Sequence, residues 1–204
     1  MINKQLSISE IISIEWDMFQ QVQNIGGRAE CQDDPETFQI MRRSQYENWS
    51  DAMIESYLDY LRQCLDRGRN LVTEKYARMM EYTDTRYYDE YLAPALPTVP
   101  NINYRLVNQI VEQQIAWEQD FVVKYPRLAA RSRPVTSEAD ADGFTSVETY
   151  ARGELLTYPT ALLQLYLDYV QELKAEGKSL SVMIEDTMVR LYGYNSIEDA
   201  EAQA

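Results

Sequence analysis

Histidine is absent from the 204 residues of this sequence. Histidine is the commonest general base and the commonest metal ligand in proteins. Its absence excludes Ser-His-Asp and Cys-His catalysis within this chain and argues against zinc, haem and non-haem iron. Magnesium or calcium held by carboxylates is the metal chemistry that the composition still allows. We therefore assign no metal ligand and leave the cofactor unknown.

Cysteine is scarce as well, because the chain has only Cys31 and Cys64, and their separation matches no metal-binding motif. The pair would permit a disulfide, but no other feature is typical of a secreted scaffold. The first residues lack the apolar core of a signal peptide, and no apolar run approaches the roughly 20 residues of a membrane span. These absences predict a cytoplasmic protein with reduced thiols and no membrane segment.

Positive charge is also in short supply. The chain has 19 basic and 33 acidic side chains, which gives a formal net charge of −14. A field of that sign repels phosphate backbones and anionic lipids. No basic stripe with interleaved aromatic residues stands against this trend. We therefore expect neither nucleic acid nor membrane as a partner.

The apolar residues that are present, 45% of the chain, recur at helical spacing. No segment of four or more residues alternates convincingly as a strand. The pattern predicts an all-α protein, and the length fits one domain over residues 1–204. The most apolar expected helix covers 101–124, and its wide apolar face predicts a central position with seven or eight helices in all. The acidic tail from about 196 to 204 is expected to fray.

Capping residues locate the first helices. Ser7, with Glu10 three residues later, forms a capping box that predicts the start of the first helix. Asp34 and Pro35 are typical of the N-cap and first position of the second helix. Further helices are expected over 51–68, 70–82, 146–156, 160–176 and 179–192. The segments 83–100 and 127–143 are expected to be mainly irregular.

The segment 24–45 holds more specific chemistry than a plain connection needs, since two glycines, an arginine, a cysteine and two aspartates share one short loop. Cys31 is a candidate nucleophile if Arg28 or a helix N-terminus lowers the pKa of its thiol. Without histidine, Glu15, Asp34 or a tyrosine would have to transfer protons. Cys31, Glu15 and Asp34 are therefore the catalytic candidates.

Arg42 and Gln45 fall on the apolar side of the expected second helix. A permanently charged guanidinium there needs an anionic partner, which could be Glu15, Asp33, Asp34 or a bound ligand. Glu15 itself lies inside the apolar stripe of the first helix. Its carboxylate must be paired, protonated or facing a polar pocket, unless it lies at the rim of a broad face.

Two groups of binding residues follow. The first would hold an anionic small molecule through bidentate arginine contacts and glycine N–H groups, and it comprises Asn24, Gly26, Gly27, Arg28, Gln32, Arg42 and Gln45. The second group comes from later expected helices and comprises Gln114, Glu118, Arg152 and Glu154.

Asp140-Ala-Asp142-Gly143 resembles the middle of a calcium loop. The match fails in detail, because Glu138 stands where the first aspartate belongs and Glu148 is one residue short of the closing position. A solvated loop is the default interpretation.

Three stretches of the chain carry a family resemblance. The first contains Glu15-Trp16 and continues from Asn24-x-Gly26-Gly27-Arg28-Ala29-x-Cys31-Gln32-x-Asp34 to Thr37-Phe38-x-Ile40-Met41-Arg42-x-Ser44-Gln45. The others are Arg152-Gly153-Glu154-Leu155-Leu156 and Tyr192-Gly193-Tyr194. Together they are similar to an uncharacterised bacterial family, domain of unknown function 4125. The resemblance spans nearly the whole chain and implies a bacterial, cytoplasmic, single-domain protein, but it implies no activity.

Two hypotheses about function remain. In the first, the protein is an enzyme or small-molecule-binding protein with an anion-accepting site at the loop after the first helix. In the second, it is a non-catalytic interaction or regulatory module, and the motif is architectural. Arg42 would then pair with Glu15 inside the bundle, and Cys31 would be a small buried hydrophobic residue. Oligomeric state and protein partners are left open.

Overall fold

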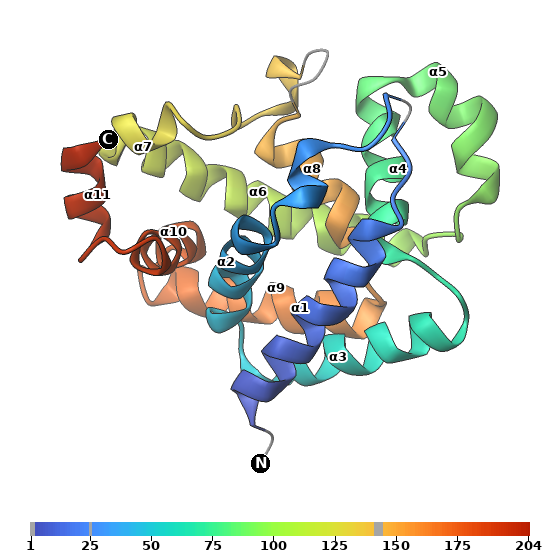
Figure 1. The fold of residues 1–204 in the computed structure, drawn as a ribbon, viewed down its shortest axis with the longest axis horizontal. Helices are drawn as coiled ribbons and strands as arrows, with labels where there is room; N and C mark the ends of the chain where they lie inside the picture. Colours follow the sequence, from blue (N-terminus) through green and yellow to red (C-terminus); the bar gives the residue numbers. More distant parts are fainter. Residues whose placement is uncertain (1–2, 25, 141–144) are drawn as a thin grey trace.

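The computed structural model describes residues 3–24, 26–140 and 145–204, and these ranges form helices and connections without a strand (Figure 1). The all-α prediction is confirmed. The longer helices are α1 (Lys4–Gln20), α2 (Pro35–Glu47), α3 (Asp51–Asp66), α4 (Leu71–Thr83), α6 (Asn101–Lys124), α8 (Val147–Leu155), α9 (Thr160–Ala175) and α10 (Leu180–Leu191). The shorter ones are η1 (Glu30–Asp33), α5 (Thr85–Tyr87), η2 (Tyr88–Leu92), η3 (Ala93–Ala95), α7 (Pro126–Ala129), η4 (Ser137–Ala139) and α11 (Ile197–Gln203).

Most helix starts follow their capping residues. Asp34 caps α2 with Pro35 as its first residue, and the Ser50 side chain accepts the Met53 N–H at the start of α3. The start of α1 differs from the prediction. The helix begins one turn earlier, at Lys4, with Asn3 as its cap. Ser7 lies inside α1, where its side chain is buried and its N–H donates to the Asn3 carbonyl at 3.1 Å, so it does not begin the helix.

The bounds of α6 agree with the expected helix 101–124, and it packs against α8, α9 and α10. Its expected enclosure by other helices is incomplete. Val122 and Val123 near its end are 40% and 84% exposed. Leu106, Val107 and Ile110 supply its buried face. The helix therefore contributes one long side of the core.

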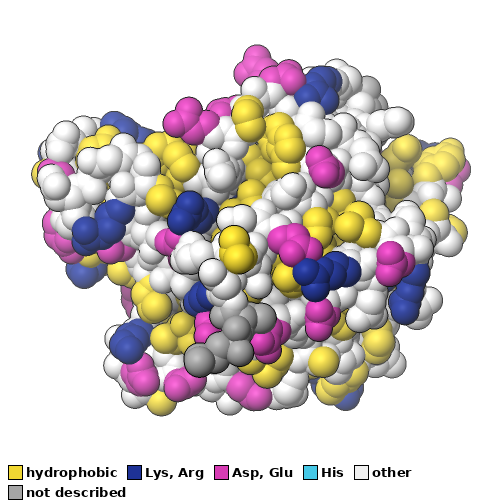
Figure 2. Space-filling view, turned by 60° about the horizontal axis from the view of Figure 1, so that its bottom comes forward, with side chains coloured by type: hydrophobic (Ala, Val, Ile, Leu, Met, Phe, Trp, Pro, Cys, Tyr) yellow, Lys and Arg dark blue, Asp and Glu magenta, His cyan; other side chains and the backbone are white. Residues whose placement is uncertain are grey.

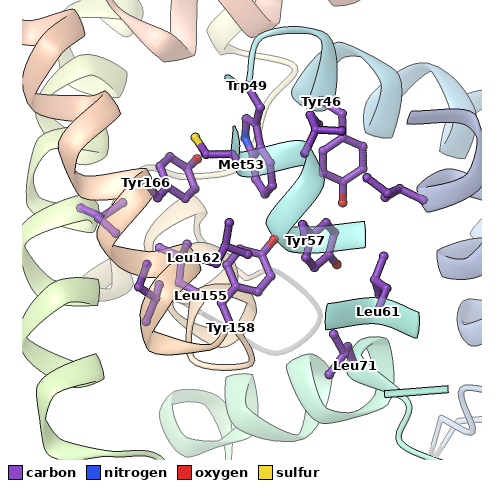
Figure 3. Packing of buried hydrophobic residues seen from close by; sticks show 14 of the residues in the cluster. Tyr46, Trp49, Met53, Tyr57, Leu61, Leu71, Leu155, Tyr158, Leu162 and Tyr166 are labelled. Carbon is purple, nitrogen blue, oxygen red and sulfur yellow. The ribbon is translucent and has the colours of Figure 1, made fainter. Parts of the chain in front are cut away.

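The main core joins the end of α2 to α3, α8 and α9 through aromatic side chains (Figure 3). Trp49 lies at its centre and is 1% exposed. Its ring contacts those of Tyr57 and Tyr166, with centroids 5.7 Å and 5.3 Å away. Such edge-to-face pairs add specific geometry to hydrophobic burial. This aromatic core fixes the helices that carry the candidate site.

A smaller core holds the C-terminal segment, where the structure differs from the expectation of a frayed tail. Ser196 caps α11, and Ile197 and Ala200 are 3% and 1% exposed. They pack against Phe121 and Val189. Because positions three apart share one helix face, even this short acidic helix has an apolar side to bury. Figure 1 shows α7, α10 and α11 together near the C-terminus.

The surface carries no single dominant apolar face in the view of Figure 2, where yellow hydrophobic groups are separated by acidic and basic side chains. None of the helices in the described ranges is long and apolar enough to cross a membrane.

Candidate functional site

Arg42 lies where α1, α2 and α8 meet, and it is 9% exposed. Its Nε is 3.1 Å from Glu15 Oε2, and its Nη2 donates to Glu15 Oε1 at 3.1 Å. Its Nη1 donates to Gln45 Oε1 at 3.0 Å and to Glu154 Oε2 at 3.1 Å. Four of the residues singled out from the sequence therefore meet at one point.

Lys75 of α4 completes the cluster. Its Nζ donates to Glu154 Oε2 at 2.6 Å and lies 3.5 Å from the centroid of the Tyr150 ring. The lysine is only 3% exposed. We call Glu15, Arg42, Lys75 and Glu154 the Arg42 network. Its two cations and two carboxylates cancel in formal charge, which is the condition under which buried ions are tolerated.

Three buried tyrosines donate further hydrogen bonds to the two carboxylates. The hydroxyls of Tyr46 and Tyr57 each donate to Glu15 Oε1 at 2.7 Å. The hydroxyl of Tyr158 donates to Glu154 Oε1 at 2.9 Å. Burial raises the pKa of all three tyrosines well above the usual value. They therefore remain protonated donors over the whole physiological range.

The charges of the network are fixed by their neighbours. Burial alone would raise the pKa of Glu154, but Arg42 and Lys75 outweigh it and hold that pKa well below its usual range. Burial lowers the pKa of Lys75, and Glu154 opposes this shift. The carboxylate of Glu154 is consequently ionised at neutral pH and bound to two cations.

Sequence reasoning missed Lys75 and the three tyrosines. The signal for Lys75 was present, because it lies four residues from both Leu71 and Met79, on the buried side of α4. The same argument had singled out Glu15. The tyrosines offered no such signal, because a tyrosine in an apolar stripe looks like an ordinary core residue.

In the loop after α1, the side chain of Gln32 points inward and is 1% exposed. Its Nε2 donates to the carbonyl oxygens of Phe19 and Val22 at 2.9 Å and 3.2 Å. Its Oε1 accepts from Asn24 Nδ2 at 3.1 Å and from the Ala29 N–H at 3.0 Å. These bonds give the Val22 carbonyl a donor and give the Phe19 carbonyl, which already accepts the Val22 N–H at 3.1 Å, a second one.

Arg28 lies outside the Arg42 network. Its Nε donates to Asp33 Oδ1 at 2.9 Å, and its Nη2 donates to the Gln32 carbonyl at 2.8 Å and to the Gln20 side chain. Its side chain is 47% exposed. Arg28 and Arg42 therefore have no hydrogen-bond partner in common among the described residues, and joint binding of an anion by the two stays a prediction.

The two glycines of the loop differ. Gly27 has φ +90°, a conformation that other residues rarely adopt, and its N–H donates to the Asn24 carbonyl at 3.0 Å. Gly26 is exposed, and a Cβ added there would meet no atom within 4 Å. Only Gly27 therefore has a clear conformational reason to be glycine.

Asp34 and Cys31 also lie apart from the network. Asp34 Oδ1 accepts the Thr37 N–H at 3.0 Å, and this hydrogen bond lowers the pKa of the carboxyl. Cys31 is exposed, Cys64 is buried, and neither forms a disulfide. The expectation of a buried Cys31, which belonged to the architectural hypothesis, is wrong. The cysteine follows the exposed loop because η1 turns only Gln32 inward.

The second group of candidate residues is divided among three places. Glu154 belongs to the Arg42 network. Arg152 is on the surface, where it pairs with Glu148 at 3.0 Å and donates to Asn108 Oδ1 at 2.6 Å. Gln114 and Glu118 line a separate cavity between α6, α8 and α10.

Of the calcium-like sequence, Asp142 and Gly143 lie outside the described residues. Asp140 Oδ1 accepts the Ser146 N–H at 2.6 Å, which ties the loop to the start of α8. In the ranges that the structure does describe, no group of three or more acidic or cysteine side chains is arranged to hold a metal ion.

The fold and the site define a class of protein, namely a helical domain whose helices converge on a buried, charge-balanced network. Comparison with known protein families assigns the chain to one of them. The family described as "Protein of unknown function (DUF4125)" matches residues 5–202, and the chain belongs to it. No curated protein and no solved structure matches the chain.

Proposed function

We propose that the protein is a non-catalytic helical interaction module in which the 24–45 motif is architectural. The observation that carries this proposal is the complete engagement of Arg42, all three of whose guanidinium nitrogens contact protein side chains. An anionic ligand at Arg42 would have to displace Glu15 or Glu154. Displacement would leave a buried carboxylate without its partner, which is strongly unfavourable.

The network is also placed where an architectural role would require it. Its four charged residues come from α1, α2, α4 and α8, which are distant in sequence. A buried ion network adds little net stability over a hydrophobic one, but it penalises any other arrangement of the helices. Residues of α6 line two surface cavities, and none of the four network residues lines either of them. These facts favour a role in fixing the fold over a role in binding.

A tyrosine-rich surface supports the interaction part of the proposal. Tyr82, Tyr91 and Tyr104 are 42%, 57% and 42% exposed, and we call them the tyrosine surface. Burial raises the pKa of Tyr82, and both Glu81 and the neighbouring Tyr104 add to that rise. Tyr91 lies in η2, which packs against α4. Tyrosine is enriched at the centres of protein interfaces because it combines large apolar area with a polar tip.

Site-specific photo-crosslinking tests this role. A photoreactive phenylalanine analogue is placed at Tyr91 or Tyr104, with Tyr192 as the matched control, since that tyrosine is 48% exposed but lies after α10. The proposal predicts that the first two positions crosslink to the same protein species in cells and that the control does not. Equal crosslinking at all three positions, or none at Tyr91 and Tyr104, would contradict it.

A further inference from the structure

The segment 96–100 joins η3 to α6 and contains two prolines three residues apart, Pro97 and Pro100. Leu96 has φ −80° and ψ 148°, and Pro100 has φ −59° and ψ 141°. Both pairs of angles are those of a polyproline II helix. We call this segment the 96–100 strap, and Figure 1 shows it as a connection without helical turns that leads into α6.

The sequence explains this conformation. The proline ring fixes φ at about −65° in Pro97 and Pro100. A residue that precedes a proline is disfavoured in the helical region, which restricts Leu96 and Val99 to extended angles. Only Thr98 is free of such restrictions. The strap is therefore preformed and loses little conformational entropy when a partner covers it.

Burial in the strap follows the period of a polyproline II helix, which has three residues per turn, so that residues three apart share an edge. Leu96 and Val99 are half-buried, and Val99 packs against the main core. Pro97, Thr98 and Pro100 are exposed. One edge thus attaches the strap to the protein, and the edge that carries both prolines faces solvent.

Arg78 anchors the strap from its inner side. This arginine of α4 is 4% exposed, and its Nη2 donates to the Pro97 carbonyl oxygen at 2.8 Å. The backbone N–H and carbonyl oxygen of the exposed Thr98, by contrast, form no hydrogen bond with the described residues. The strap is therefore held in place while its outer side keeps polar groups that a partner can bind.

Arg105 adds a positive charge beside the strap. It is exposed and forms no ion pair in the part of the chain that the structure describes, unlike the exposed Arg62 and Arg190. It lies one turn after Asn101, the first residue beyond the strap, and long side chains on a helix lean toward its N-terminus. A partner that covers the strap therefore meets an unpaired cation at its edge.

We propose that the 96–100 strap is the docking element of the interaction surface and that its partner is a protein domain with an aromatic-lined groove and a carboxylate at the end of that groove. Grooves of this kind bind polyproline II segments with the spacing of Pro97 and Pro100. The carboxylate would pair with Arg105. This inference rests on the proposed interaction role and specifies its partner, because the strap lies between Tyr91 and Tyr104 of the tyrosine surface in the sequence.

A second copy of this chain is a poor occupant of the strap. Recognition of polyproline II needs a groove lined by aromatic side chains. Neither of the two cavities along α6 is lined by one. The proposal therefore commits to a different protein.

Photo-crosslinking from Thr98 tests the proposal. The full chain carries a photoreactive phenylalanine analogue at that position and is irradiated in an extract of its source cells. The crosslinked peptide of the partner should contain aromatic residues. Deca-L-proline, which forms a polyproline II helix, should compete with the crosslink, and a glycine-serine peptide of equal length should not.

Two variants with matched controls sharpen the test. Pro97→Ala should lower the crosslink yield about five-fold or more, because a proline at the centre of the contact is lost. Pro94→Ala is its control, since Pro94 is also exposed but lies in η3, outside the strap. Arg105→Gln should lower the yield more in low salt than in high salt, whereas Arg67→Gln, at an exposed position after α3, should not change it. Thermal unfolding verifies that all four variants are folded.

The outcomes separate this inference from the proposed function. Crosslinks from Tyr91 and Tyr104 that persist in Pro97→Ala and in deca-L-proline would overturn the inference and leave the interaction role intact. No crosslink from Thr98, a crosslink to a second copy of the chain, or a partner peptide without aromatic residues would overturn it as well. Crosslinks from Thr98 but from neither tyrosine would contradict the tyrosine surface alone, and no crosslink from any of the three positions would contradict both.

Discussion

The Arg42 network and the cavity, or cleft, between α6, α8 and α10 each contain two glutamates. Glu15 and Glu154 of the network are buried, whereas Glu118 and Glu185 of the cleft are only half-buried. In the network each carboxylate contacts a cation, and the pKa of Glu154 is held below its usual range. In the cleft no cation pairs with either carboxyl in the described part of the chain, and the pKa of Glu185 rises to about 7. A buried carboxylate that is paired with a cation is a fixed structural element, whereas a half-buried carboxyl without such a partner responds to pH.

The two regions therefore have opposite pH dependences. A depressed folded-state pKa, as for Glu154, contributes stability that is present above the unfolded value of 4.5 and is lost at more acidic pH. A raised folded-state pKa, as for Glu185, contributes stability at acidic pH that is lost as the pH rises toward 7.

Arg42→Ala should produce the largest loss, about 3–5 kcal/mol in the free energy of unfolding, because it leaves two buried carboxylates without their shared cation. Chemical denaturation measures the loss. Arg43→Ala is the matched control in the same helix, since the Arg43 side chain is 41% exposed and pairs with Glu47 at the surface. The control should lose less than about 1 kcal/mol. Similar losses in both variants would remove the distinction between network and surface.

Glu185→Gln should flatten the pH dependence of stability between pH 4.5 and 7. In that window the folded wild type binds more protons than the unfolded chain, so its stability falls as the pH rises. We expect a fall of roughly 1–3 kcal/mol in the wild type and much less in the variant. Glu118 is the charged group that adds to the Glu185 shift. Denaturation curves between pH 4.5 and 7 measure the free energy of unfolding at each pH. Glu172→Gln, at an exposed position of α9, is the control and should keep the wild-type dependence on pH.

Gln32→Ala should cost about 1–2 kcal/mol, because it removes the side-chain donor to the Val22 carbonyl and one of the two donors to the Phe19 carbonyl. Hydrogen exchange should show faster opening of the last turn of α1. Gln39→Ala, at an exposed position of α2, should leave both quantities nearly unchanged. If the two variants behave alike, the hydrogen bonds of Gln32 do not stabilise the end of α1.

Arg28→Ala should have the smallest effect, below about 1 kcal/mol, since its pair with Asp33 is exposed to solvent. Denaturation in low and high salt should show a small and screenable contribution. A loss close to that of Arg42→Ala would instead place Arg28 in the same energetic unit as the network.

Much of the fold was predictable because it depends on local signals. The Asp34-Pro35 cap and the apolar stripe of α6 each define their helix from neighbouring residues. The start of α1 differs from the prediction at Ser7 because Asn3, one turn earlier, caps the helix. The docking of α11 was missed because its apolar side consists of only two residues, whose partners lie in α6 and α10.

The candidate site was predictable only in part, for a similar reason. Glu15 and Arg42 stood out because each is a charge within an apolar stripe, and the structure pairs them. Their contact with Glu154 and Lys75 depends on how α4 and α8 pack, which helical periodicity does not determine. Glu185 lacked any sequence signal, because a glutamate in the amphipathic helix α10 is unremarkable. The pKa of its carboxyl group rises only because packing half-buries it and brings it near Glu118.

A double-mutant cycle between Glu15 and Arg42 tests the architectural role most directly. The free energy of unfolding is measured for Glu15→Gln, Arg42→Met and the double variant. The account predicts that the double variant is less destabilised than the sum of the single variants, with a coupling of about 1–3 kcal/mol, because the two charges satisfy each other. Additivity within about 0.5 kcal/mol would contradict it and would show that the pair does not hold the helices together.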